Sequence, residues 1–329
     1  MSKKRIIILS ILVVGIALAL YFFQKPWNTS SIKGNEVSVK DTARINKLFL
    51  ANKNGIKILL EKQIDGSWKC NNKFKVDPPK INLLLATLHD MQLQHPIDPA
   101  ARNTVITDLA IRGRKLEIYM DNELERTIYI GSETPEKTGT YFMNESTKEP
   151  LAIHIPGFVG YLTPRFIMDE IAWKDKLVFN EDPKNLGQLT VTYPDEPNAS
   201  FEIHDNQLFD ANGAQLPFDP IKLKTYLHSF QNLYLEGYLS FATTAQADSI
   251  SKTTPMVSIE WQNTNKQTIR LDLFRKKVGK RTKMQLTEQD EALEFDSETY
   301  FALVNKQPEL ASVQQYSFGK ILKKAEQFR

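Results

Sequence analysis

The first pattern along the chain is an apolar run near its start. Within residues 6–23 only Ser10 and Gly15 are not apolar. As a helix, the run would span about 27 Å, close to the ~30 Å hydrocarbon core of a bilayer. The basic residues at 3–5 precede it, and basic residues that flank a membrane helix stay in the cytoplasm. The pattern predicts a cytoplasmic basic head (1–5), a single-pass anchor (6–23) in the inner, cytoplasmic membrane and an extracytoplasmic or periplasmic body.

A cleaved signal peptide is the alternative interpretation of this run. Ala17-Leu18-Ala19 fits the small-x-small pattern at which such peptides are cut. Cleavage there would leave large apolar residues, 20–23, at the new N-terminus, which favours the uncleaved anchor. Residues 24–38 are rich in Asn, Ser, Thr and Lys and are interpreted as a spacer. Whether the chain is cut after Ala19 stays open.

A second pattern is a helix start that occurs twice. Asp77-Pro78-Pro79-Lys80-Ile81 returns, at an offset of 142 in the numbering, as Asp219-Pro220-Ile221-Lys222-Leu223. Asp is a favoured helix cap and Pro is favoured at the first helical position. The apolar residues that follow fall at helical steps of three and four: Leu84, Leu85, Leu88 and Met91 in the first copy, and Tyr226, Leu227, Phe230 and Leu233 in the second.

Apolar residues match at offsets of 141 or 142 over most of the body. The matched pairs include Leu48 with Leu189, Leu116 with Val257, Ile118 with Ile259, Ile130 with Leu271, Phe142 with Met284, Leu151 with Leu293, Phe158 with Tyr300 and Leu162 with Val304. The offset predicts a first repeat at 39–172, a second at 173–310 and an amphipathic C-terminal tail at 311–329. Two unrelated domains with similar spacing remain the alternative.

Each repeat has the pattern of hairpins around one long helix. In the first, extended segments at 47–51 and 56–62 are joined at Asn54-Gly55, and Asn-Gly between apolar runs is a strong hairpin signal. After the helix come alternating segments at 115–120 and 126–130. Helical stretches at 159–171 and 298–305 are expected to close the two repeats. The fold class predicted is α+β, with two similar, mostly antiparallel units behind a transmembrane helix.

These positions resemble a known family. The resemblance rests on Trp68, on Asp77 before the helix, on Ile130-Gly131, and on the positions Pro135, Tyr141, Leu162 and Phe166. It is to the bacterial family filed as domain of unknown function 4340 and covers most of 39–310. The resemblance implies one N-terminal membrane helix, no catalytic residues, and an accessory role beside ABC transport systems of the gliding-motility type.

The second repeat departs from the family pattern at two positions. Leu208-Phe209 stands in the stretch that matches Trp68, and Leu271-Asp272 replaces Ile130-Gly131. The second repeat is therefore interpreted as a structural partner of the first.

Charge and cysteine content narrow the function classes. Lys and Arg number 42 against 39 Asp and Glu, a net charge of +3. The basic residues at 3–5 account for all of that excess, so the body is neutral, whereas nucleic-acid binding needs a basic face. The single cysteine, Cys70, excludes an intrachain disulfide and a cysteine-based zinc site.

No catalytic motif occurs in the sequence. His89 and His95 are the closest of five histidines, and their spacing does not suit two metal ligands on one helix face. Phosphate-loop, serine-hydrolase and zinc-protease motifs are absent. The acidic run from Glu288 to Glu298 lacks the residue order of a calcium loop. We expect no catalytic residue, no metal and no cofactor.

Two segments are candidates for interaction. The first is a basic patch on a predicted hairpin tip, formed by Arg275, Lys276, Lys277, Lys280, Arg281 and Lys283. It is either a solvated tip or a contact for anionic lipid or an acidic partner. The second is the tail at 319–329, whose apolar residues have helical spacing. The tail either docks on the body or binds a partner or a membrane surface.

The sequence thus predicts a noncatalytic, membrane-anchored accessory or scaffold protein of a cell-envelope system. An ABC-type transporter is the candidate association, with the membrane and an envelope or membrane protein as partners. One alternative is an envelope module that binds a glycan or lipid through aromatic residues, for which the candidates are Trp68, Tyr161, Trp173, Tyr234 and Tyr238. The second alternative is a hydrolase with an unrecognised carboxylate or Ser/His site.

Overall fold

The structure is a computed structural model that describes residues 37–240, 244–278 and 293–329. Its packing divides the chain into two compact units. Unit 1 comprises Leu83–Phe166 together with the chain up to Ile45, and unit 2 comprises Asn46–Asn82 and Ile167–Arg329. The predicted repeat boundaries stay predictions, and each unit is described by itself.

The predicted basic head, anchor and most of the spacer lie outside the described residues. Within the described ranges, no helix is long and apolar enough to cross a membrane. The longest of them has 13 residues, whereas a spanning helix needs about 20. The predicted location in the cytoplasmic membrane is corrected on this finding, and no location is proposed for the protein.

Unit 1 contains an antiparallel sheet with the strand order β6-β7-β8-β9-β5. Asp121 and Asn122 have positive φ angles between β6 and β7, as a two-residue hairpin turn requires, so that predicted hairpin is confirmed. The elements are the C-terminal part of α2 (Pro78–Asp90), β5 (Gln92–Pro96), α3 (Arg102–Arg112), β6 (Arg114–Met120), β7 (Glu123–Glu133), β8 (Thr140–Asn144), β9 (Pro150–His154) and the 3-10 turn η3 (Thr163–Arg165).

The N-terminal part of unit 2 contains four strands in the order β4-β3-β2-β1. They are β1 (Ile45–Asn52), β2 (Lys57–Lys62), β3 (Trp68–Cys70) and β4 (Phe74–Lys75). The Asn52 side chain accepts hydrogen bonds from the backbone N–H groups of Asn54 and Ile56, both at 3.1 Å, and Gly55 has φ +80°. The hairpin predicted at Asn54-Gly55 is therefore confirmed.

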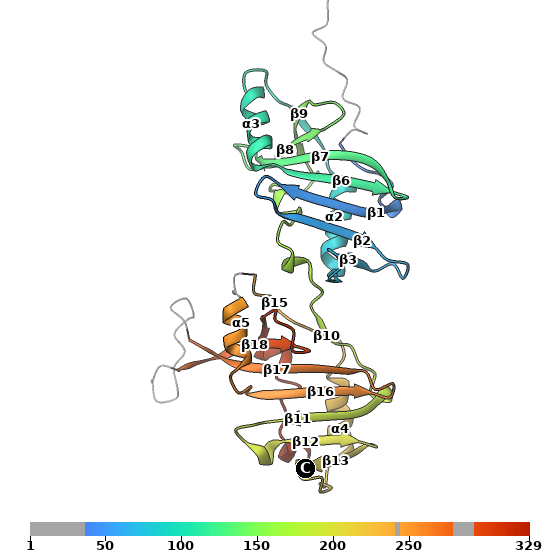
Figure 1. Cartoon of the computed structure of the whole chain (residues 1–329), viewed down its shortest axis with the longest axis vertical. Coiled ribbons are helices and arrows are strands. Elements are labelled where there is room, and N and C mark those ends of the chain that lie inside the picture. The colour runs from blue at the N-terminus through green and yellow to red at the C-terminus, as the bar shows by residue number, and fades with distance from the viewer. Residues whose placement is uncertain (1–36, 241–243, 279–292) are drawn as a thin grey trace, which may run out of the picture. The chain divides into compact units, whose positions relative to one another are not determined.

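The larger part of unit 2 is an antiparallel sheet in the order β13-β12-β11-β16-β17-β18-β19-β15 (Figure 1). A separate two-stranded pair joins β10 and β14. The elements are η4 (Ile171–Trp173), β10 (Leu177–Phe179), η5 (Pro183–Asn185), β11 (Leu186–Thr192), η6 (Pro197–Ala199), β12 (Phe201–His204), β13 (Gln207–Asp210), α4 (Pro220–His228), β14 (Leu233–Tyr234), β15 (Gly237–Tyr238), α5 (Thr244–Ser251), β16 (Val257–Asn263), β17 (Thr268–Lys277), β18 (Phe295–Val304), β19 (Ala311–Gln314), α6 (Gln315–Phe318) and η7 (Ala325–Phe328).

Two helices cover opposite faces of this sheet, as Figure 1 shows. Leu223, Tyr226 and Leu227 of α4 pack into the main core against strands β11, β12, β16 and β17. Ala247 of α5 packs on the other face against Phe274 and Leu303 in a smaller cluster. The fold is therefore sheet-rich and mostly antiparallel with few helices, which confirms the coarse α+β prediction.

The predicted closing helices are corrected. Residues 298–304 belong to strand β18, and 159–171 contains only a short 3-10 turn before η4 begins at Ile171. In β18, Ala302 faces the main core and Leu303 faces the cluster under α5. A strand buried on both faces has no polar alternation, and a short apolar run cannot be distinguished from a helix by its period.

The C-terminal tail completes the main core of unit 2. Phe318, Ile321, Ala325 and Phe328 are all buried in it. The Phe328 ring makes edge contacts with Phe201 and Tyr226, each with ring centroids 5.0 Å apart. Edge-to-face pairs of this kind add to the stability gained by burial. The tail thus docks on the body, as one of the two alternatives predicted.

We predict that Phe328→Ala lowers the free energy of unfolding by about 3–5 kcal/mol, because it removes a buried aromatic ring and leaves a cavity. The exposed neighbour Glu326→Ala should change it by less than about 0.5 kcal/mol. Urea unfolding followed by circular dichroism measures both values. Equal effects of the two substitutions would contradict the docked tail.

Candidate functional site

Only three residues of the predicted basic patch lie in the described structure. Arg275, Lys276 and Lys277 are at the end of β17, and Lys280, Arg281 and Lys283 lie outside the described residues. The Lys276 Nζ is 3.8 Å from Asp296 Oδ2, and the Lys277 Nζ is 3.7 Å from Glu294 Oε1.

The Arg275 guanidinium lies 5.8 Å from the centroid of the Phe295 ring. The basic arm of this hairpin therefore faces its acidic arm, which compensates the charge of the described lysines. Recognition of an acidic partner by the whole patch stays a prediction.

The Asp-Pro-x-Lys motif, which occurs twice in the sequence, holds a distant chain segment at the start of a helix each time. In the first copy, the backbone N–H of Asp77 donates to the Trp173 carbonyl at 2.8 Å, and the Lys80 ammonium donates to the Ala172 carbonyl. Burial lowers the Lys80 pKa, and the nearby Asp77 carboxylate opposes that shift. We call this arrangement the closing clamp.

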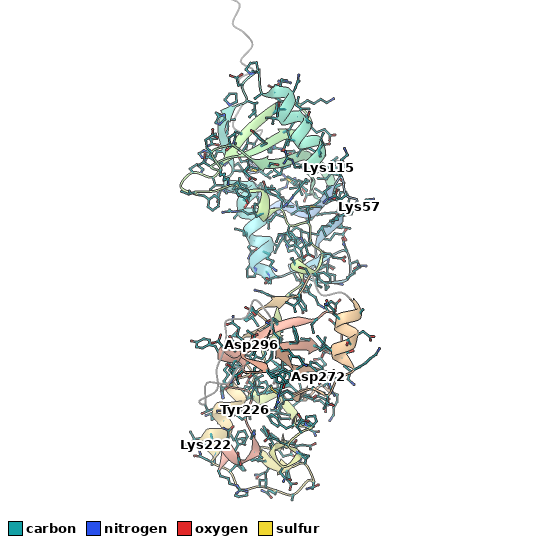
Figure 2. The ribbon with its side chains drawn as sticks, turned by 90° about the vertical axis from the view of Figure 1, so that its left-hand side faces the viewer. Lys57, Lys115, Lys222, Tyr226, Asp272 and Asp296 are labelled. Atoms are coloured by element: carbon teal, nitrogen blue, oxygen red, sulfur yellow. The ribbon has the colours of Figure 1, made fainter. Side chains whose placement is uncertain are left out.

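The second copy makes similar contacts with the C-terminal tail, although its lysine binds the residue after the aromatic one, whereas Lys80 binds the residue before it. The Asp219 N–H donates to the Phe328 carbonyl at 2.7 Å, and the Lys222 ammonium donates to the Arg329 carbonyl. Lys222 and Tyr226 both project from α4 (Figure 2). The Asp219 carboxylate also caps α4, at 2.7 Å from the Ile221 nitrogen. The sequence predicted the cap at Asp219. It did not predict the clamp, although the lysine that both motifs contain, Lys80 or Lys222, was a signal for it.

Two buried tyrosines also hold the tail. Tyr226 Oη donates to the Ile321 carbonyl at 3.1 Å, and Tyr193 Oη donates to the Lys323 carbonyl at 3.0 Å. Burial raises the pKa of both phenols. Their displaced pKa values therefore reflect a structural role in packing the tail.

In unit 1, Asp108 fixes helix α3 to strand β7. Its carboxylate accepts hydrogen bonds from the Ser132 N–H at 3.0 Å and the Ser132 hydroxyl at 2.9 Å, and the Arg112 Nε lies 2.9 Å away. A side chain at Gly131 would place its Cβ 2.9 Å from both Asp108 Oδ2 and Tyr141 Cβ. The family positions Gly131 and Tyr141 thus meet where this helix approaches the sheet closely.

In unit 2, a ladder of paired side chains lies on the corresponding strands. Ser258 faces Asp272 and Glu260 faces Arg270 across β16 and β17. The Ser258 hydroxyl donates to Asp272 Oδ1 at 2.6 Å. The Arg270 Nη2 lies 2.9 Å from Asp272, and its Nη1 pairs with Glu260. The buried Asp272 carboxylate (Figure 2) is thus neutralised by a neighbour on its own strand.

Three of the five histidines have separate neighbours. His89 pairs with Asp90, and the His204 ring stacks on Phe209 with centroids 4.2 Å apart. The His228 Nδ1 lies 2.8 Å from the Lys224 carbonyl. Within the described residues, no three His, Cys, Asp or Glu side chains form a group that could hold a metal ion.

Of the five candidate ligand-binding aromatics, two are buried, two are exposed and Tyr238 is half-buried. Trp68 and Trp173 are core residues, with 5% and 0% of their surface exposed. Tyr161 and Tyr234 are exposed. The Tyr238 ring lies 4.8 Å from the Lys174 ammonium.

Cys70 is buried on β3, and its thiol pKa is raised to about 12. Burial is the main cause, and the negative charge of Glu170 adds to it. From its ordinary value of 9.0 up to about 12, the folded thiol keeps a proton that the unfolded chain releases. The free energy of unfolding therefore falls as the pH rises through this window.

We predict that a disulfide reagent such as DTNB labels native Cys70 at pH 8 at least a hundredfold more slowly than it labels the unfolded chain, because the thiolate is the reactive form. The absorbance change on labelling measures both rates, and Cys70→Ser is the control for background reaction. Immediate labelling of the folded protein would contradict a buried thiol.

We predict that Asp108→Ala lowers the free energy of unfolding by about 1–3 kcal/mol, because it leaves the Ser132 donors without their acceptor. Arg112→Gln should cost less than about 1 kcal/mol, since this side chain is 71% exposed and such ion pairs contribute little. Urea unfolding distinguishes the two. A larger loss for Arg112→Gln would disprove the role given to Asp108.

Comparison with known proteins places the chain in a family. The model of a domain of unknown function, DUF4340, matches residues 68–254, which is more than half of the chain, so the protein belongs to that family. The resemblance noted from the sequence is thereby confirmed. No curated protein and no solved structure matches the chain.

Proposed function

For a member of a family without a known activity, we propose a noncatalytic role as an accessory or scaffold protein that works by binding. The resemblance makes an ABC-type transport system the first association to test. The proposal does not depend on where the protein is located.

The observation that carries this proposal is the use of the buried polar side chains. Asp108, Asp272, Lys80, Tyr193 and Tyr226 each bind a neighbour that fixes an element of the fold. An active site instead gathers titratable groups with displaced pKa values into one concave place. Here the displaced pKa values are caused mainly by burial and belong to residues that hold the structure together. This pattern favours a rigid binding protein over the hydrolase alternative.

We further infer that the chain contains two copies of one α+β unit. In the first, the strands run β3-β2-β1 and β6-β7-β8-β9-β5; in the second, β13-β12-β11 and β16-β17-β18-β19-β15. Each strand keeps its place when its number rises by ten. The helices match as well. In the first copy α2 lies between β3 and β5 and α3 follows β5; in the second, α4 lies between β13 and β15 and α5 follows β15.

The closing clamp supports the same inference independently. Its donors, Asp77 with Lys80 and Asp219 with Lys222, are related by the offset of 142 that relates the helix starts, and both pairs bind the end of a repeat. On this comparison the second repeat extends through the tail to residue 329. On this inference the tail matches the segment at Ala172 and Trp173, which extends the first repeat one residue past its predicted end.

On this inference, the offset between matching residues of the two copies increases after Ile130 and Leu271. The residue pairs predicted beyond that point then have to be shifted. In the first copy Ile130 pairs across the strands with Phe142, whereas its match in the second copy, Leu271, pairs with the much more distant Val304. The second repeat therefore has the longer hairpin between β17 and β18, and the basic patch lies in it. Phe142 consequently matches Val304 in place of Met284, and the other pairs predicted beyond it shift likewise.

The outer sheet faces are the proposed binding surfaces. Beside α3, Glu117 pairs with Lys115 at 2.6 Å and accepts from the Tyr119 hydroxyl at 2.8 Å. In the second copy, Glu260 and Arg270 lie on β16 and β17, the strands that match β6 and β7. Half-exposed, internally paired polar faces suit protein contacts, because their side chains are ordered before binding.

We predict that photo-crosslinking from these faces captures one and the same partner. The crosslinking amino acid p-benzoyl-phenylalanine replaces Tyr129 on β7 or Glu260 on β16, and the cells are irradiated. Mass spectrometry should identify a component of an ABC-type transport system, because both faces belong to one binding protein. The matched control replaces Lys137, in the turn between β7 and β8. Capture from the control position alone, or from none, would contradict the scaffold role.

A further inference from the structure

Unit 2 contains a hollow of about 730 Å³ beside helix α4. Its floor is apolar and its rim is charged. The floor consists of Leu186, Phe218, Leu223 and Leu227, and the rim includes Asp182, Lys184, Asp205, Lys224 and His228. Sites for small molecules have this size and this combination of an apolar body with a few polar groups.

Trp68 has the matching position in the strand register of the first repeat. The Trp68 carbonyl accepts from the Val76 N–H at 2.8 Å, and Trp68 pairs with Lys62 across β2 and β3. Phe218, which matches Val76 at the offset of the helix starts, lines the hollow. Trp68 lies on the same side of β3 as Cys70, and both side chains are buried. An indole ring thus closes this end of the first core.

The second repeat has a shorter connection at this point and no aromatic residue in it. Its strands β12 and β13 are joined directly at Asp205 and Asn206, both with positive φ. The first repeat instead has the longer connection 63–67 between β2 and β3. With the shorter turn, Leu186 and Phe218 at this end of the second core are only partly buried. The hollow therefore follows from the departure at Trp68 that the sequence displays.

The rim carries two carboxylates and two ammonium groups, and within the described parts of the chain only the ammonium groups are without a partner. The ammonium groups of Lys184 and Lys224 have no hydrogen-bond or ion-pair partner among the described residues. The Asp182 carboxylate already caps η5, 3.0 Å from the Lys184 nitrogen, and Asp205 lies 3.2 Å from His204 Nδ1. The lysines are thus the rim charges left for a ligand.

From these observations we propose that the hollow binds a small aromatic carboxylate. The ring would take the place that Trp68 occupies in the first repeat, and the carboxylate would contact Lys184 and Lys224. The inference rests on the two-copy architecture proposed above, but it does not depend on a scaffold role or on any partner protein.

The test uses indole-3-acetate as the probe, with isothermal titration calorimetry on the full chain. We expect saturable binding of one equivalent, with the cationic analogue tryptamine at least tenfold weaker. The double variant Lys184→Gln/Lys224→Gln should weaken binding by about tenfold, the loss of roughly one charge-assisted contact. The control Lys266→Gln, in the turn between β16 and β17, should leave binding unchanged.

A reciprocal variant tests the comparison with Trp68. Trp68→Ala should open a matching hollow in the first repeat, so that neutral indole raises the melting temperature of this variant more than that of the unsubstituted protein. No saturable binding of indole-3-acetate, tryptamine binding equally well, or an unaffected lysine variant would each overturn the proposal. None of these binding measurements depends on the crosslinking experiment. The ligand site and the scaffold role can therefore be disproved separately.

Discussion

The structure depends most on the contacts that hold residues 172–173 at the start of α2 and residues 328–329 at the start of α4. A backbone N–H at Asp77 or Asp219 and an ammonium at Lys80 or Lys222 satisfy carbonyls of the closing segment. Those carbonyls would otherwise remain unpaired beside a buried aromatic residue, and unpaired buried polar groups are costly. The clamp therefore positions Trp173, which is fully buried, and Phe328, which lies in the main core of unit 2.

In unit 2, the consequence of the clamp is a continuous series of aromatic contacts. Phe328 contacts Tyr226, Tyr226 contacts Phe230, and Phe230 contacts Trp261, with centroid separations of 5.0 to 5.3 Å. These rings connect the tail, α4 and β16, which are far apart in sequence. Burial of large rings is the main favourable contribution to folding here, whereas most of the surface ion pairs contribute little. The tail is consequently part of the fold.

The sequence predicted those features that repeat locally and missed those that depend on distant partners. Asn54-Gly55, the alternation around Leu116 and Ile128, and the Asp-Pro helix starts were found because turn chemistry and periodicity are local. Helix α3 was missed because only Val105, Asp108 and Leu109 of its residues are buried, which leaves a weak apolar period. The apolar pattern of strand β18 predicted a helix because both faces of the strand are covered. The hollow beside α4 was not predicted, since it exists only through the absence of a ring that another part of the chain supplies.

The differences between the two proposed copies indicate where function can diverge. Gly131 is required because Asp108 and Tyr141 approach it closely, whereas Asp272 at the matching position joins a polar ladder. Trp68 closes one core, while a two-residue turn leaves the other open, and one hairpin is lengthened. These three differences, at Asp272, at the two-residue turn and in the longer hairpin, all lie in the second copy. None of them involves the residues of its closing clamp. Because the clamp and the aromatic core maintain the fold, the ends and outer face of this copy are free to acquire contacts with other molecules. The first copy retains the family positions, so we expect the protein's individual specificity to come from the second.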